Sequence, residues 1–227
     1  RQRQMCIRDR MYDMFRRFLR DAGLNEKNHF TSFAELIEQI GWESDTALGL
    51  MMVNLAMENP QIAWYVNTLD IGVYYERKQV EEMLTALDVK PKDAKSIVKS
   101  YKRIVETPFG TSLNFGYFTD DENIVRLKWS MSDNRVFLYA LYRFVEKCNL
   151  NREFNVSYLL DESVERDGVS PVRLFGLYDE EELRNVLLGL SARYPNFINA
   201  TYTNDLQSIS LRDKSSSDVL KLFEEEY

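Results

Sequence analysis

Apolar positions recur at helical spacing through the first third of the chain. The run TALGLMMVNLAM at residues 46–57 is apolar on nearly all sides, which is typical of a helix buried in a core. It is shorter than the roughly 20 residues that a membrane span requires. The flanking segments carry amphipathic stripes. The pattern predicts an all-helical region over residues 11–70, with helices at 11–20, 31–40, 46–57 and 61–69.

Residues 77–110 carry two shorter amphipathic segments around a DVKPK turn. The first has an apolar face that extends to Leu87, and the second is expected to begin at an N-cap Asp93. Aromatic and β-branched runs at residues 113–118 and 124–130 then flank an acidic turn, which predicts a β-hairpin. Helix, turn, helix and hairpin follow one another in this order in a winged helix, a relative of the helix-turn-helix.

The same order of elements recurs in the second half of the chain. Helices are expected at residues 135–148 and 179–194, a second hairpin at 197–211, and a closing helix near the end. The two halves share no residue-level repeat. The predicted fold is mainly α with small β-hairpins: a helical N-terminal part over residues 11–70, followed by two winged-helix-like units at 71–130 and 131–227.

Charge limits how the chain as a whole can meet nucleic acid or a membrane. The 36 acidic residues outnumber the 29 basic ones, and the net charge of −7 opposes non-specific adhesion to either. A nucleic-acid role must therefore be local. Residues 90–103 meet this condition, with six basic side chains and one acid. The six candidate contacts to nucleic-acid phosphates are Lys90, Lys92, Lys95, Lys99, Lys102 and Arg103.

Three of these lysines share one helical face. Lys95, Lys99 and Lys102 are spaced i, i+4 and i+7, opposite the apolar stripe, where the second helix of a helix-turn-helix meets phosphates. A solvated helix face is the alternative interpretation. No Asn, Gln or further Arg accompanies them there to read base edges, so we expect phosphate contact without sequence specificity.

The sequence presents no catalytic, metal-binding or cofactor-binding constellation. The single histidine, His29, lies in a polar connector, and no phosphate-cradling glycine motif occurs. Carboxylates cluster at residues 120–122 and 179–182, where a turn and a helix start explain them. Cys6 and Cys148 are too few and too distant for a disulfide framework or a cysteine metal site. A reducing cytoplasm is the expected location, and no cofactor is expected.

The first ten residues, RQRQMCIRDR, differ from the rest of the chain. The string MCIRDR resembles translated sequencing adapter, so residues 1–10 are interpreted as a non-native segment. On this interpretation Met5 is not a start codon, and the chain is a fragment whose N-terminal part is missing.

Two late segments carry a family resemblance: DGVSPVRLFGL, residues 167–177, and LLGLSARYPNFINATYTNDLQSISLRDKSSSDVLKLF, residues 187–223. With NPQIAWYVNTLDIGVYYERKQVEEML and ETPFGTSLNFGYF upstream, they resemble the C-terminal region of large bacterial proteins of the phosphoadenosine phosphosulfate reductase family. These proteins are relatives of the sulfur-handling ATP pyrophosphatases of DNA phosphorothioation. The resemblance runs from about His29 to the end of the chain.

The resemblance implies a role but no chemistry for these residues. In this family an N-terminal domain binds the nucleotide through a Ser-Gly-Gly-type loop, in some members with cysteines for an iron–sulfur cluster. This sequence has neither feature. The resemblance implies a non-catalytic C-terminal accessory module that positions nucleic acid, with DNA as the candidate, or a partner for the upstream catalytic domain of the same protein, away from any membrane. The alternative is a free-standing winged-helix protein-interaction module that binds no nucleic acid.

Overall fold

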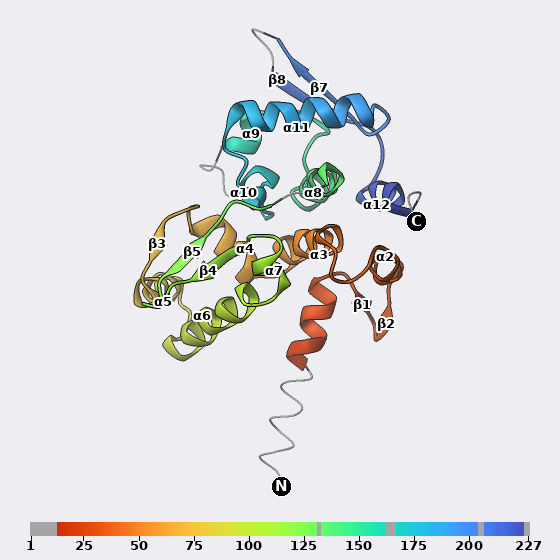
Figure 1. Ribbon diagram of the computed structural model, residues 1–227. Coiled ribbons are helices and arrows are strands. Elements are labelled where there is room, and N and C mark those ends of the chain that lie inside the picture. Colours follow the sequence, from red (N-terminus) through yellow and green to blue (C-terminus); the bar gives the residue numbers. More distant parts are fainter. Residues whose placement is uncertain (1–12, 131–132, 162–166, 204–206, 225–227) are drawn as a thin grey trace.

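The computed structural model describes residues 13–130, 133–161, 167–203 and 207–224. It is mostly helical with small antiparallel sheets, as the sequence predicts (Figure 1). Residues 1–10, interpreted above as a non-native segment, lie outside the described residues.

The N-terminal part is a group of helices. Residues 13–21 are helical, but the polar connector that follows holds two short paired strands, so the prediction of an all-helical region over residues 11–70 is wrong at this point. Among the described residues, no helix combines the length and the apolar character needed to cross a membrane. The elements are β1 (Asn25–Glu26), β2 (His29–Phe30), α2 (Ser32–Ile40), α3 (Asp45–Glu58) and α4 (Pro60–Thr68).

Each of the three labelled helices in this part begins at a side-chain cap. Oxygens of Thr31, Ser44 and Asn59 accept hydrogen bonds from backbone N–H groups in the first turns of α2, α3 and α4. Such caps satisfy donors that have no partner inside the helix. Gly41 ends α2 at a φ of 93°, a conformation that glycine adopts without strain.

Residues 71–130 hold a helical pair and a three-stranded antiparallel sheet. The strand order is β3-β5-β4, so the strand that precedes the helices pairs with the last strand. The sequence predicted the hairpin but gave no sign of β3. The elements are β3 (Tyr74–Tyr75), α5 (Arg77–Thr85), α6 (Pro91–Val105), α7 (Pro108–Thr111), β4 (Gly116–Phe118) and β5 (Ile124–Arg126).

The rest of the chain repeats this arrangement with longer strands. The order β6-β8-β7 again pairs the strand before the helices with the last strand. The elements are α8 (Asn134–Lys147), β6 (Glu153–Asn155), α9 (Ser157–Leu160), α10 (Pro171–Phe175), α11 (Glu180–Arg193), β7 (Ile198–Tyr202), β8 (Gln207–Leu211) and α12 (Ser216–Glu224).

Two local predictions in the helical pair are wrong. Asp93 does not cap α6, because the helix already begins at Pro91, whose fixed φ suits the first helical position, with Lys90 at the N-cap. Leu87 is not part of the buried face of α5, and 59% of its surface is exposed. The helix ends at Thr85, so helical spacing no longer governs where Leu87 points.

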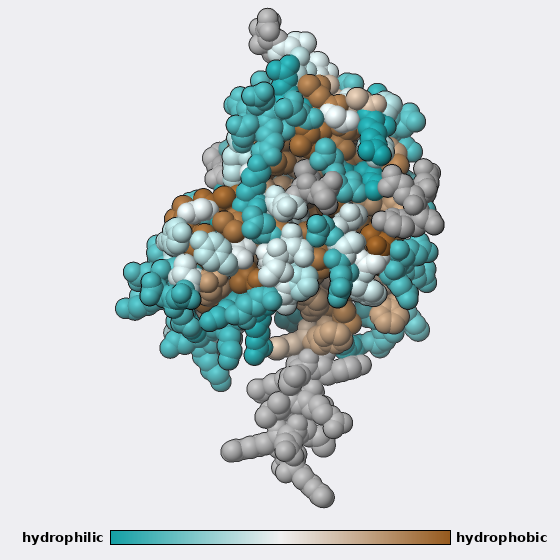
Figure 2. Space-filling view, in the orientation of Figure 1, coloured by the Kyte–Doolittle hydropathy of each residue, from teal (hydrophilic) through white to brown (hydrophobic). Residues whose placement is uncertain are grey.

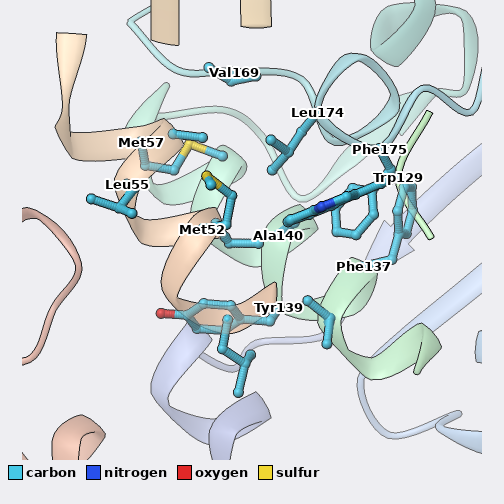
Figure 3. Close-up of a cluster of buried hydrophobic side chains, with 14 of the residues drawn as sticks. Met52, Leu55, Met57, Trp129, Phe137, Tyr139, Ala140, Val169, Leu174 and Phe175 are labelled. Carbon is cyan, nitrogen blue, oxygen red and sulfur yellow. The ribbon is translucent and has the colours of Figure 1, made fainter. Parts of the chain in front are cut away.

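The core joins the N-terminal helices to both sheet-containing regions. Figure 3 shows Met52 of α3 beside Ala140 of α8, with Trp129, Phe137 and Phe175 in the same cluster. The Trp129 and Phe175 rings lie 4.5 Å apart between centroids, and those of Phe137 and Phe175 lie 5.4 Å apart. Aromatic pairs at these distances stabilise a core beyond the area that they bury. The two regions therefore pack on one shared core.

Candidate nucleic-acid interface

Helix α6 is held against α4 by its apolar face. Buried side chains recur along it every three or four residues, with Tyr101 at the centre. The Tyr101 ring lies nearly parallel to that of Trp64, 6.4 Å between centroids, and its hydroxyl donates a 2.8 Å hydrogen bond to the Gln61 carbonyl. These contacts fix the rotation of α6 about its axis, so its opposite face points away from the core.

That outer face carries a line of cations, which we call the basic stripe: Lys92, Lys95, Lys99 and Arg103. All four are exposed, and their spacing of i, i+3, i+7 and i+11 keeps them on one side of the helix. At 1.5 Å per residue the basic stripe covers about 16 Å of helix axis, enough to meet several phosphates. Figure 2 shows a hydrophilic surface over α5 and α6, at the lower left.

Among the residues that the structure describes, no ion pair neutralises the charges of the basic stripe. The predicted contact Lys90 is also exposed, at the N-cap of α6. Lys90 and Lys92 therefore stand at the positive end of the helix dipole, where cations do not stabilise a helix. An anion bound there would be favoured by the lysines and the helix together.

Lys102, the third lysine of the predicted face, has a different environment. Its side chain is 40% exposed, and its Nζ lies 3.7 Å from Oε1 of Glu122, in the turn between β4 and β5. The other oxygen of Glu122 accepts a 2.9 Å hydrogen bond from Nη1 of Arg77. Glu122 thus holds two cations, one at the start of α5 and one near the end of α6.

These contacts shift the pKa values of Glu122 and Arg77 in directions that favour their charged forms. The hydrogen bond from Arg77 lowers the pKa of the Glu122 carboxyl below its usual value, and Lys102 adds a smaller effect in the same direction. Hydrogen bonds to Glu122 and to Glu81 raise the pKa of Arg77. At neutral pH the cluster is therefore a carboxylate between two cations.

The hairpin turn beside α6 is acidic. Asp120 and Asp121 precede Glu122 there and are exposed. Carboxylates repel nucleic-acid phosphates, so this turn offers no contact of its own to a nucleic-acid backbone. If α6 binds nucleic acid, the helix supplies the attraction and the turn opposes it.

The equivalent helix of the second region, α11, has no such stripe. Its N-cap is Asp179, whose carboxylate accepts the Glu182 N–H, and its first turn contains Glu180, Glu181 and Glu182. Carboxylates are favoured at this end of a helix. The clustered acids at 179–182 therefore have the capping role predicted for them, and the two regions present opposite charge on corresponding helices.

Other candidate groups lie apart from one another. His29 is exposed in β2, and Cys148 is half-buried at the end of α8; Cys6 lies outside the described residues. Within the described ranges, no three His, Cys, Asp or Glu side chains are placed to hold a metal ion. The positive charge of the basic stripe on α6 is suited to binding an anion.

Two buried arginines were not predicted from the sequence. Arg126 and Arg173 are buried, with 1% and 8% of their surfaces exposed. Arg126 lies in an apolar strand, where alternation gives no reason to expect a buried cation. The contact between Arg77 and Glu122 spans 45 positions of sequence and could not be foreseen either.

The chain matches no family model, and no curated protein or solved structure is significantly similar to it. The resemblance to the phosphoadenosine phosphosulfate reductase family therefore stays a prediction.

Proposed function

We propose that this chain is a non-catalytic module of two winged-helix units that binds the phosphate backbone of DNA through α6. The observation that carries the proposal is the basic stripe: four exposed cations on one helix, with no carboxylate partner in the described part of the chain. Like charges at i and i+4 on a helix repel one another, and an anion bound along the basic stripe would relieve this repulsion.

The strand order supports the winged-helix part of the proposal. In each region a helix leads into a short strand, further helices follow, and a hairpin closes the sheet with its last strand in the middle. A winged helix has this topology, and the second helix of its helix-turn-helix corresponds to α6. Since a fold does not determine a function, the binding role rests on the charges and not on the topology.

The test is charge reversal on the basic stripe. Lys95→Glu/Lys99→Glu should weaken binding to a fluorescein-labelled duplex of about 20 base pairs at least tenfold, measured by anisotropy at low salt. Lys27→Glu/Lys221→Glu is the matched control, because it changes the net charge by the same amount and both lysines are exposed, in the β1–β2 connector and on α12, away from α6 (Figure 1). Equal losses for both variants would show general electrostatics, and unchanged binding would remove α6 from the proposal.

A second part of the proposal concerns the parent protein. We infer from the family resemblance that the module serves an upstream nucleotide-dependent sulfur enzyme and positions DNA for it. Sequencing the source DNA across the codons before Met11 tests this. A continuous reading frame with a Ser-Gly-Gly-type nucleotide loop is the expected result, and an upstream frame without such a loop contradicts it.

One observation favours the alternative, a protein-interaction module. Tyr74 and Tyr117 lie on either side of Val125 on one face of the β3-β5-β4 sheet, and their hydroxyls are 3.2 Å apart. Val125 is buried, whereas the tyrosines are 61% and 38% exposed. Exposed aromatic surface of this kind is enriched at protein interfaces. This alternative predicts no duplex binding at any salt concentration.

A further inference from the structure

The cations near α6 fall into two groups that a ligand would meet differently. The basic stripe is unpaired within the described residues, whereas Arg77 and Lys102 are held by Glu122 at 2.9 Å and 3.7 Å. Lys102 lies one residue before Arg103, so the held pair adjoins the C-terminal end of the basic stripe. A nucleic acid that follows the helix would reach Glu122 there.

Glu122 is placed as a phosphate would be. Arginine recognises carboxylates and phosphates with the same donor fork, and a lysine ammonium binds either as a point charge. One oxygen of Glu122 meets Arg77 and the other meets Lys102. The side chains of Arg77, Lys102 and Glu122 are 37%, 40% and 49% exposed, so an incoming anion can reach all three groups.

We infer that the Glu122 carboxylate competes with nucleic-acid phosphate. Glu122 occupies Arg77 and Lys102 and thereby limits the affinity of the α6 surface for DNA. This inference rests on the proposed function. A bound phosphate gains the two cations only by displacing the carboxylate. The hairpin turn therefore lowers the affinity for DNA in two ways. Glu122 occupies two cations, and the carboxylates of the turn repel phosphate.

Displacement of the Glu122 carboxylate from Arg77 and Lys102 costs little free energy. Arg77 keeps a second partner, Glu81 at 3.0 Å, after Glu122 leaves, and exposed ion pairs contribute little stability. The backbone of Glu122 has a φ of 60°, which glycine adopts more readily than other residues, and displacement of the carboxylate need not change this backbone conformation. Nothing in these contacts ties the Glu122 carboxylate to the folded core.

The experiment compares two variants that remove the same charge from the same turn. Glu122→Gln releases Arg77 and Lys102, whereas Asp121→Asn removes an exposed carboxylate for which no ion pair is seen among the described residues. Binding to the labelled duplex is measured by anisotropy over a series of salt concentrations. Glu122→Gln should raise affinity about three- to tenfold and steepen the slope of log K against log salt by about 1, since one more phosphate is contacted. Asp121→Asn should raise affinity less than about twofold.

The outcomes distinguish failure of the inference from failure of the proposed function on which it rests. Equal gains for the two variants, or no gain for Glu122→Gln when the wild type binds through the basic stripe, would overturn the inference alone. Binding by Glu122→Gln but not by the wild type would support it. The absence of binding by both proteins at low salt would overturn the proposed function and the inference together.

A second variant guards against a local change in the turn. Glu122→Gly removes the carboxylate and suits the positive φ, so it should fold at least as well as the wild type. It should reproduce the gain in affinity of Glu122→Gln. A gain seen with Gln but not with Gly would overturn the inference, because removal of the competing carboxylate is common to both.

Discussion

Arg126 and Arg173 donate hydrogen bonds to the same acceptor, the carbonyl oxygen of Val66. Nη1 of Arg126 and Nε of Arg173 each lie 2.9 Å from it. Arg126 also donates to the carbonyls of Leu69 and of Arg173 itself. The last carbonyls of a helix have no partner within it, and cations there also complement the helix dipole. Because Arg126 belongs to β5 and Arg173 to α10, the contact ties both sheet-containing regions to the end of α4.

Replacement of Arg126 by Met should lower the free energy of unfolding by about 2–4 kcal/mol, because buried carbonyls lose their donors. Arg126 is only 1% exposed, so water cannot take its place without a change in packing. Urea denaturation measures the effect. The control is Arg103→Met, on the exposed basic stripe, which should change stability by less than about 0.5 kcal/mol. A loss below about 1 kcal/mol for Arg126→Met would contradict the structural role.

Tyr139 should make stability depend on pH in the alkaline range. Its hydroxyl donates a 2.7 Å hydrogen bond to Asn54, and burial raises its pKa to about 12. In an unfolded chain a tyrosine titrates near pH 10. Between about pH 10 and pH 12 the folded state keeps a proton that the unfolded state loses, so the free energy of unfolding falls as pH rises, by up to about 1.4 kcal/mol per pH unit.

The measurement is urea denaturation at a series of pH values from about 9 to 11.5, with Tyr139→Phe for comparison. Other buried tyrosines add their own slope, so the difference between the two proteins reports on Tyr139. The variant should be less stable at pH 9 and should lose stability less steeply above pH 10. Parallel curves for the two proteins would mean that Tyr139 does not titrate as its burial implies.

Two glycine substitutions should have opposite signs. A Cβ added to Gly110, within α7, would lie 1.9 Å from the carbonyl oxygen of Val105 at the end of α6, so Gly110→Ala should destabilise the protein by about 1–3 kcal/mol. A Cβ added to Gly189, within α11, would meet no atom within 4 Å, so Gly189→Ala should stabilise by about 0.5–1 kcal/mol. Denaturant midpoints of the two variants on the same side of the wild type would contradict the packing described here.

The sequence predicts those features that depend on nearby residues. Helix α3 was predictable because its apolar residues are consecutive, and the cap of α11 because Asp179 directly precedes three glutamates. Strand β3 was not predictable, since its two residues gain their partner β5 only about 50 positions later. The same limit applies to the site: spacing grouped Lys102 with Lys95 and Lys99, but only the fold reveals its contact with Glu122.

The salt dependence of duplex binding tests the central claim most directly. Phosphate contacts by the four residues of the basic stripe predict a slope of log K against log salt of about −3 to −4 for the wild-type protein. Lys95→Glu/Lys99→Glu should remove at least about two from the magnitude of that slope. A wild-type slope near zero, or the same slope in both proteins, would contradict the claim that α6 binds a nucleic-acid backbone.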